Sequence, residues 1–311
     1  MKRVILKIDG GMGKNVMGIA VCKAIRKQYP SAEIVVVTPF PDIFQNCPYV
    51  DKKLVPANLN YFWRDYLRGN ENESKIILLD PYGASDFVLG TGGHLIKVWC
   101  EMNGITYNGE LPELHFTRQE HKQYKEMCHS PDGKKIMVIQ TNGGPAPASY
   151  PNPSPNPWER YAWPRDLPNA TAQQVVDVFA KDHHVLHIRR QDQLPLNNTR
   201  GLELKFRQLC GLLLYSDKRL LIDSFAQHVA VAVNKPSVVC FIANKPAQFG
   251  YEMHTNLVAN PYTVTPEYKN SVFTEFNTIG ATEEEFPYQG EEDIFDVDKI
   301  IEAVRNCKEK V

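Results

Sequence analysis

The opening of the sequence constrains the fold most strongly, because a strand, a glycine-rich turn, a helix and a second strand are predicted there in immediate succession. Residues 4–8 form a short apolar run typical of a buried strand, and residues 9–13 (Asp-Gly-Gly-Met-Gly) form the turn. Apolar side chains recur at helical spacing over residues 15–28, and residues 33–38 form the second apolar run. This β-turn-α-β order predicts a parallel sheet covered by helices.

The same alternation continues through the chain. Further strands are predicted at 75–80, 135–140, 185–188, 220–223 and 237–242, and helices at 94–103, 171–181, 206–213, 226–233 and 294–309. A proline-rich loop at 145–157 separates two of these elements. We therefore predict an α/β fold of two doubly wound, Rossmann-like domains facing a cleft, at residues 1–130 and 131–290. The C-terminal helix, within 291–311, is expected to pack back on the first domain.

The composition excludes several classes of protein. The chain has 311 residues, and its 35 Lys+Arg against 36 Asp+Glu exclude a binder of nucleic acids or membranes that is basic overall. A local basic surface stays open, for which the N-terminal half supplies Lys2, Arg3, Lys7, Lys14, Lys23, Arg26, Lys27, Arg64 and Arg68. The seven cysteines lack CxxC spacing, which indicates free thiols. Without a signal-peptide or membrane-span pattern, a cytoplasmic protein is expected.

The turn at residues 10–15 (Gly-Gly-Met-Gly-Lys-Asn) is a candidate phosphate site. It joins a strand to the start of a helix, where free N–H groups and the helix dipole favour an anion. A P-loop would need glycine at Ile8 and Ser or Thr at Asn15, and a dinucleotide fingerprint would need an acidic residue at Thr38. The alternative is a tight turn that lets the helix pack closely on the sheet.

Residues 221–228 (Leu-Ile-Asp-Ser-Phe-Ala-Gln-His) form a second candidate site. A strand ends here in Asp223-Ser224, and His228 follows near the end of the first helical turn. Because α/β proteins bind ligands at the carboxyl ends of their strands, these side chains are candidates for ligand binding. The alternative is an Asp that caps the helix and a His on the surface.

Two patterns that resemble metal sites have structural explanations. His183 and His187 would share one face of a strand, but no carboxylate partner is evident in the sequence. Asp296 and Asp298 have DxD spacing, yet they stand at the start of a helix, where the helix dipole stabilises acidic side chains. We therefore expect no metal site.

Cationic side chains supply candidates for binding a diphosphate. Arg189 and Arg190 close a predicted strand, where a bidentate contact with phosphate oxygens is feasible, the alternative being ordinary surface charge. Arg160 lies between Trp158 and Trp163, a cluster suited to stacking on a base or a sugar or to structural packing.

Several of these segments together resemble the family-9 glycosyltransferases, the ADP-heptose–lipopolysaccharide heptosyltransferase group, which have the two-domain GT-B fold. In the first half, the likeness lies in Met12-Gly13 before a helix, in residues 29–37 (Tyr-Pro-Ser-Ala-Glu-Ile-Val-Val-Val) and in residues 46–51 (Asn-Cys-Pro-Tyr-Val-Asp).

The second half resembles the nucleotide-binding part of that family. Asp223-Ser224 and His228 stand where the family has an Asp-Ser/Thr-Gly-x-x-His motif, and residues 230–239 are similar to the stretch that follows it. Trp163-Pro164 resembles the Trp-Pro after the family's donor-phosphate loop, which places Thr141, Asn142 and Arg160 near the diphosphate.

The resemblance implies an inverting, metal-independent glycosyltransferase that needs no cofactor and moves a sugar from a nucleotide-diphosphate sugar to an acceptor hydroxyl. The donor is expected on the second domain and the acceptor on the first. The expected donor-binding residues are Gly13, Thr141, Asn142, Arg160, Arg189, Arg190, Asp223, Ser224 and His228. A surface glycan or a hydroxymethylated pyrimidine in phage DNA is the expected acceptor.

Two departures from the family pattern change the expected chemistry. Lys14 stands where the family has the Asp that acts as general base, and Phe225 replaces the glycine of the nucleotide-site motif. We therefore expect Asp80 or Asp9 to act as the base and Lys14 to contact a phosphate. The alternative is a catalytically inactive nucleotide-binding α/β protein.

Overall fold

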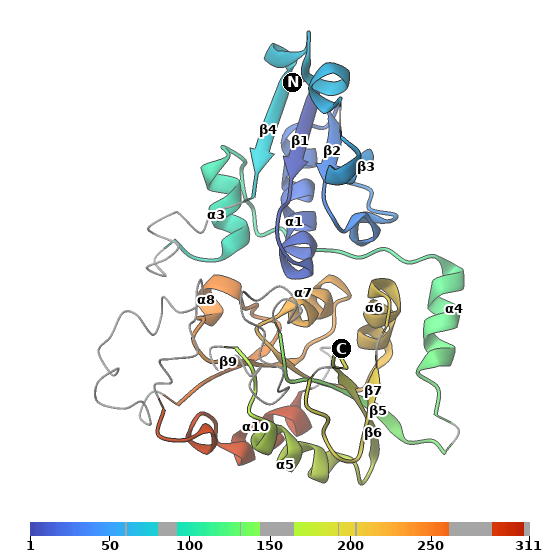
Figure 1. The fold of residues 1–311 in the computed structure, drawn as a ribbon, viewed down its shortest axis with the longest axis vertical. Coiled ribbons are helices and arrows are strands. Elements are labelled where there is room, and N and C mark those ends of the chain that lie inside the picture. Colours follow the sequence, from blue (N-terminus) through green and yellow to red (C-terminus); the bar gives the residue numbers. More distant parts are fainter. Residues whose placement is uncertain are drawn as a thin grey trace.

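The structure is a computed structural model that describes residues 1–59, 61–79, 92–130, 132–143, 165–191, 193–202, 204–260 and 288–307. It contains two parallel sheets, one in the N-terminal half and one in the C-terminal half (Figure 1). The first has the order β3-β2-β1-β4, with β1 (Arg3–Lys7), β2 (Glu33–Val37), β3 (Lys52–Leu54) and β4 (Ser74–Leu78). The second has the order β10-β9-β8-β5-β6-β7, with β5 (Lys135–Gln140), β6 (His183–Ile188), β7 (Thr199–Leu202), β8 (Lys218–Ile222), β9 (Val238–Phe241) and β10 (Thr255–Val258).

Helices connect and cover these strands. The α-helices are α1 (Met12–Gln28), α3 (Leu95–Met102), α4 (Arg118–Met127), α5 (Asn169–Phe179), α6 (Phe206–Tyr215), α7 (Phe225–Ala232), α8 (Pro246–Phe249) and α10 (Val297–Asn306). Shorter turns of helix are η1 (Pro41–Phe44), η2 (Pro56–Asn58), η3 (Trp63–Leu67), η4 (Glu71–Glu73) and η7 (Glu291–Asp293). Among the helices of the described ranges, none is long and apolar enough to cross a bilayer. The predicted α/β class with parallel sheets is confirmed.

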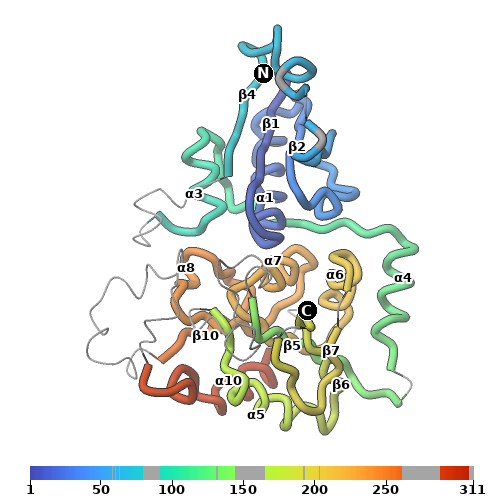
Figure 2. Tube along the Cα trace, in the orientation of Figure 1, coloured from blue at the N-terminus to red at the C-terminus, as the bar shows by residue number. Residues whose placement is uncertain are grey.

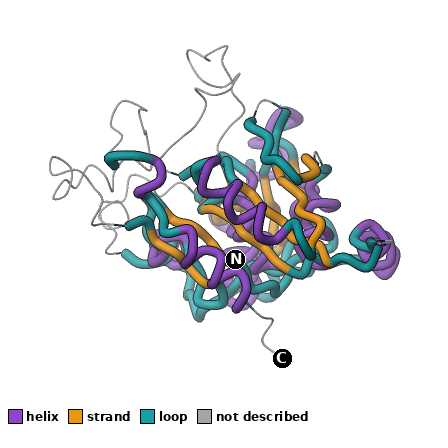
Figure 3. The backbone as a smooth tube through the Cα atoms, turned by 90° about the horizontal axis from the view of Figure 1, so that it is seen from below, coloured by secondary structure: helices purple, strands orange, loops and turns teal. Residues whose placement is uncertain are grey.

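The central strands β5, β8 and β9 of the second sheet are apolar because both of their faces are buried, and Figure 3 shows helices on either side of the strands. In β5, Ile136 and Val138 face the hydrophobic cluster that includes α6 and α7. Met137 and Ile139 face the cluster that includes α5 and α10. A strand that is buried on both faces consists of a continuous apolar run, which is why β5 could be predicted from the sequence.

The two halves pack directly on each other, since one hydrophobic cluster runs from the first sheet to α6 and α7. Helix α1 contacts α7, and the backbone N–H of Leu114 donates to the carbonyl of Ala232 at 2.9 Å. In Figure 1 the first sheet points its carboxyl ends at the second half. The loops that follow β1 and β8 are therefore brought together at the junction of the two halves.

Helix α4 carries the chain from one half to the other and lies beside α6 (Figure 2). It begins with a capping box, in which the Thr117 hydroxyl accepts from the Glu120 N–H and the Glu120 carboxylate accepts from the Thr117 N–H. The Nε of Arg207 in α6 also donates to Glu120, at 2.5 Å. This hydrogen bond lowers the pKa of Glu120 to about 2.

We expect Glu120→Gln to lower the free energy of unfolding by about 3 kcal/mol at pH 7, because it leaves the largely buried guanidinium of Arg207 without its charged partner. Since the pKa of Glu120 is depressed in the folded state, its contribution is complete above pH ~4.5 and is lost as the pH falls toward 2. Urea unfolding across this range should show the two proteins converging at acidic pH. Glu101→Gln, which removes an exposed pair with Lys97, is the control. A difference that does not change with pH would contradict the assignment.

The C-terminal helix does not lie where the sequence led us to expect it. Helix α10 packs on α5, β8 and β9, and its buried side chains Ile300, Ile301 and Val304 belong to the cluster of the second half. The amphipathic pattern predicted the helix itself but not which sheet its apolar face covers. Asp296 caps this helix by accepting from the N–H groups of Asp298 and Lys299, so the DxD pattern has the structural role expected.

Candidate functional site

The glycine-rich turn at residues 10–15 lies at the junction of the two halves. Gly10 has a φ of +96°, a left-handed conformation that favours glycine, and the Lys14 side chain lies against it. A Cβ on Gly13 would lie 3.1 Å from Cδ2 of His228 and 3.4 Å from Cα of Phe225. Glycine at position 13 thus lets the start of α1 approach the start of α7.

The starts of α1 and α7 are both open to an anion. Their N-cap residues, Gly11 and Ser224, form no side-chain cap within the described residues, and neither helix has an acidic residue in its first turn. The first N–H groups of a helix lack intrahelical partners and carry the positive end of its dipole. Two such starts in contact bring the unpaired N–H groups of both halves to one junction, an arrangement that favours an anion.

Asp223 is a buried carboxylate directly behind this junction. It is 5% exposed, and its two oxygens accept from Nε2 of Gln227, at 2.6 Å, and from Nδ2 of Asn244. Burial raises the pKa of Asp223, while Arg165 and the two amides oppose the rise. The carboxylate does not cap α7, so the capping alternative considered from the sequence is wrong.

His228 is also buried, at 3% exposed, so the alternative of a surface histidine is wrong as well. Its Nδ1 lies 2.9 Å from the hydroxyl of Tyr251. The ring of Tyr251 in turn contacts His94 of the N-terminal half, with 4.9 Å between the ring centroids. Burial lowers the pKa of His228 well below its usual value, and His94, His254 and Arg165 lower it further.

The loop after β5, which contains Thr141 and Asn142, lies beside Ser224. Nε2 of His187 lies 2.8 Å from the Thr141 hydroxyl, which donates to Oδ1 of Asn142 at 2.7 Å. A Cβ on Gly143 would lie 3.2 Å from Oγ of Ser224 and 2.8 Å from Cδ of Arg165.

Asp166 holds this loop in place. Its carboxylate accepts from Nδ2 of Asn142 at 2.9 Å and from the N–H of Gly143 at 2.8 Å. The adjacent Arg165 is near enough to Asp223 and His228 to affect the pKa of each. The sequence analysis missed Arg165 and Asp166, although they follow directly after the Trp163-Pro164 that drew attention to this segment.

The other predicted site residues are placed less centrally or lie outside the described residues. Arg189 contacts Gly201 of β7 and donates to the carbonyls of Arg190 and Gln193, so it stabilises the turn after β6. The N–H of Arg190 donates to Oε1 of Gln193 in the same turn. Asp9 is 62% exposed and pairs with Lys7 at 2.8 Å. Asp80, Arg160, Trp158 and Trp163 lie outside the described residues.

The histidine pair of β6 has ordinary structural partners. His183 contacts the carboxylates of Asp182 and Asp217, and His187 contacts Thr141. The sequence had shown no carboxylate partner for this pair, and Asp217 reaches it from the start of β8. In the described ranges, no cluster of three or more His, Cys, Asp or Glu residues is arranged to hold a metal ion.

A cavity of about 740 Å³ lies between the halves, next to Tyr251. The N-terminal half contributes His94, Tyr107 and Leu111, and the C-terminal half contributes Tyr251 and Met253. A larger cavity of about 870 Å³ is lined by His183 and Lys134, at the opposite ends of the strands from Ser224. Of these two cavities, the one between the halves is next to the candidate site.

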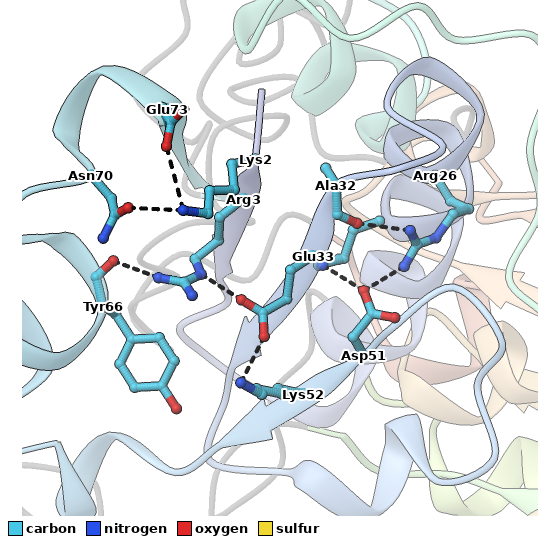
Figure 4. Close-up of polar contacts among 11 residues, drawn as sticks. Lys2, Arg3, Arg26, Ala32, Glu33, Asp51, Lys52, Tyr66, Asn70 and Glu73 are labelled. Atoms are coloured by element: carbon cyan, nitrogen blue, oxygen red, sulfur yellow. Dashed lines mark hydrogen bonds and ion pairs between the residues drawn. The ribbon is translucent and has the colours of Figure 1, made fainter.

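Most of the basic residues proposed for a local basic surface are paired with carboxylates. Figure 4 shows Lys2 with Glu73, Arg3 with Glu33, and Arg26 with Asp51. The remaining pairs are Lys7 with Asp9, Lys23 with Glu113, Lys27 with Glu110 and Arg64 with Asp65. This pairing weakens the positive field that a nucleic acid would meet on the N-terminal half.

The sequence matches no protein-family model and no curated protein. The structure is nevertheless similar to solved glycosyltransferases. The glycosyl transferase family 9 structure from Veillonella parvula DSM 2008 is 12% identical, with a TM-score of 0.64 over 98% of this chain and 97% of that one. The E. coli ADP-heptose lps heptosyltransferase II is 12% identical, with a TM-score of 0.65 over 97% of each chain. E. coli heptosyltransferase WaaC with ADP is 10% identical, with a TM-score of 0.52 over 83% of this chain and 93% of that one.

These similarities extend over both sheets and the junction between them. They confirm the fold that the sequence resemblance predicted. The chain has the two-domain GT-B fold of the family-9 glycosyltransferases.

Proposed function

We propose that this protein is a glycosyltransferase that moves a sugar from a nucleoside-diphosphate sugar to an acceptor hydroxyl. The observation that carries the proposal is the contact of two uncapped helix starts, α1 and α7, between the halves and beside the buried Asp223. Such a junction stabilises the negative charge of a leaving diphosphate. The similar structures include an ADP-heptose transferase and a heptosyltransferase with ADP, which supports the same chemistry here.

In the proposed reaction, the acceptor oxygen forms a bond to the sugar carbon as the bond from that carbon to the diphosphate oxygen breaks. The electron pair of the broken bond leaves with the nucleoside diphosphate, and the proton of the acceptor hydroxyl passes to a carboxylate base. Lys14 and Arg165 supply positive charge from the two halves, which allows the leaving group to be neutralised without a metal. We place Gly13, Thr141, Asn142, Ser224 and His228 around the donor.

Arg160, Arg189 and Arg190 remain proposed donor contacts from the sequence resemblance. The base is proposed to be Asp80 or Asp9. Asp9 lies next to the first loop and is exposed, so its ion pair with Lys7 can exchange for another partner at little cost.

The acceptor is proposed to be a glycan rather than DNA. The cavity between the halves has aromatic and apolar walls, provided by Tyr107, Leu111 and Tyr251, which suit stacking against a sugar ring. Ion pairs with carboxylates also neutralise most of the cations proposed for a basic surface on the N-terminal half. Binding of duplex DNA that falls steeply with salt concentration would favour the DNA acceptor instead.

The test combines binding and turnover. The wild type is screened with UDP-, GDP- and ADP-sugars, and the correct donor should raise the melting temperature by mass action. Release of nucleoside diphosphate from that donor is then measured for Asp80→Asn and Asp9→Asn, one of which should lose about 100-fold or more in kcat. Asp65→Asn, in an exposed ion pair, is the control. Full turnover in both variants would reject both bases, and a donor that binds but transfers its sugar neither to water nor to a panel of glycan acceptors would identify an inactive nucleotide-binding protein.

A further inference from the structure

Tyr251 joins the two halves at the buried centre of the site. Its side chain is 6% exposed, its hydroxyl lies 2.9 Å from Nδ1 of His228, and its ring contacts His94 and His254. It follows α8, beyond the segment that resembles the nucleotide-site motif, and the sequence analysis did not single it out.

The hydrogen bond between Tyr251 and His228 has two possible directions, which correspond to the two neutral tautomers of the imidazole. If Nδ1 carried the proton, it would donate to the phenol oxygen, and the phenol O–H would have no acceptor among the described residues. If Nε2 carries the proton, the phenol O–H donates to Nδ1, and the N–H left without an acceptor in the described ranges is the one on Nε2, which is not among the fully buried unpaired atoms and can donate to water or to a ligand. An unpaired buried donor costs about 1–3 kcal/mol, so the second arrangement is favoured.

The surroundings of His228 disfavour the doubly protonated, charged form. The groups that face it are His94 from the start of α3, His254 from the turn before β10, Arg165 from the segment before α5, and Tyr251 itself. Burial is the main cause of its lowered pKa, and the neighbouring histidines and Arg165 add to it. These surroundings favour the neutral imidazole.

The donor nitrogen of this neutral imidazole faces the N-terminal half. The ideal Cβ of Gly13 is 3.1 Å from Cδ2 and 3.5 Å from Nε2 of His228, so the Cδ2–Nε2 edge of the ring lies at the start of α1. Within the described part of the chain, Nε2 has no hydrogen-bond acceptor. It is therefore available to a ligand that enters between the starts of α1 and α7.

We propose that Tyr251 is a positioning residue that holds His228 in its Nε2–H tautomer, so that Nε2 donates a hydrogen bond to the leaving diphosphate. This inference rests on the proposed function for the identity of the ligand, whereas the tautomer itself depends on the protein alone. During transfer the electron pair of the broken sugar–oxygen bond is left on the diphosphate, and the Nε2–H hydrogen bond strengthens as this charge develops. No proton needs to move from His228.

The first test is the ¹⁵N spectrum of the protein labelled at its histidine side chains, with the His228 signals assigned by their loss in His228→Gln. The wild type should show a protonated Nε2 and an unprotonated Nδ1 at neutral pH. In Tyr251→Phe, both nitrogens should shift toward the average of the two tautomers. A protonated Nδ1 in the wild type, or an unchanged spectrum in Tyr251→Phe, overturns the proposal whether or not the protein binds a nucleotide.

The second test is kinetic and uses the donor identified by the thermal-shift screen. Tyr251→Phe should lower kcat for release of the nucleoside diphosphate by about 10-fold, with the donor KM changed less than about twofold, because the hydrogen bond acts mainly on the developing charge. Tyr124→Phe, a buried tyrosine whose hydroxyl makes a 3.4 Å contact with Glu120 on α4, is the matched control. A kcat for Tyr251→Phe equal to that of the control overturns the positioning role. If no nucleotide sugar binds but the tautomer is as described, the proposed function fails and the tautomer assignment stands.

Discussion

The Asp223→Asn variant is expected to release nucleoside diphosphate from the sugar donor at least about 100-fold more slowly than the wild type. Both oxygens of Asp223 accept hydrogen bonds from side-chain amides, those of Gln227 and Asn244. An asparagine at this position must turn its own NH₂ group toward one of these donors. Hydrogen bonds to a charged group contribute about 1.5–3 kcal/mol each, and about 2.7 kcal/mol corresponds to a factor of 100 in rate.

The substitution should also change the shape of the site. Gln227 belongs to α7, and Asn244 follows β9, so the carboxylate fixes two neighbouring segments at the carboxyl edge of the second sheet. It also faces Arg165, whose charge it opposes. We therefore expect weaker donor binding as well as slower turnover, measured by the donor's thermal shift and by kcat/KM.

The chain offers a matched control on the same strand. Asp217 precedes β8 and Asp223 follows it, and Asp217 pairs with His183 and Lys135 at the end of the sheet remote from the junction. Asp217→Asn should keep wild-type turnover and donor binding. Equal activity of Asp223→Asn and Asp217→Asn would show that Asp223 has only a structural role.

The sequence predicted the elements whose signal is local. Strands β5, β8 and β9 are apolar because both of their faces are covered, and the helical spacing of residues 15–28 predicted most of α1. The short strands β3, β7 and β10 were missed because they are exposed edge or near-edge strands of three or four residues without an apolar run. Their pairing depends on neighbouring strands that the local sequence does not specify.

The candidate site could be predicted only where its residues form a local sequence motif. The resemblance pointed to residues 10–14 and 223–228, and the structure brings these segments together. It did not point to Arg165, Asn244 or Tyr251, which lie on three separate loops and meet the motif only in the folded chain. His228 is buried because α1 of the other half covers it through Gly13, a contact that no local pattern encodes.

Gly211→Ala is expected to destabilise the fold by about 3 kcal/mol, because among the glycines of the described ranges Gly211 is the one whose new Cβ would make the shortest contact. An ideal Cβ on Gly211 of α6 would lie 2.2 Å from Cγ, 2.4 Å from Cδ2 and 2.6 Å from Cβ of Tyr124 in α4. Rotation of the Tyr124 side chain can move Cγ and Cδ2 but not Cβ, which is bonded to the backbone and would still lie 2.6 Å away, so α4 must move away from α6. The loss should exceed the gain of about 1 kcal/mol in helix propensity.

A double-mutant cycle separates the clash from the intrinsic effect of alanine. Introduced into Tyr124→Gly, which removes the Cβ as well as the ring, the same Gly211→Ala substitution should no longer destabilise and should add up to about 1 kcal/mol, since the obstructing side chain is gone and the helix propensity remains. Gly18→Ala in α1 is the comparison, because its new Cβ would meet chiefly the terminal methyl of Ile8, at 2.5 Å, which can rotate aside. Urea unfolding should therefore give Gly18→Ala a clearly higher free energy of unfolding than Gly211→Ala. If Gly211→Ala lowers the free energy of unfolding equally with and without the Tyr124 side chain, the predicted clash between α4 and α6 is wrong.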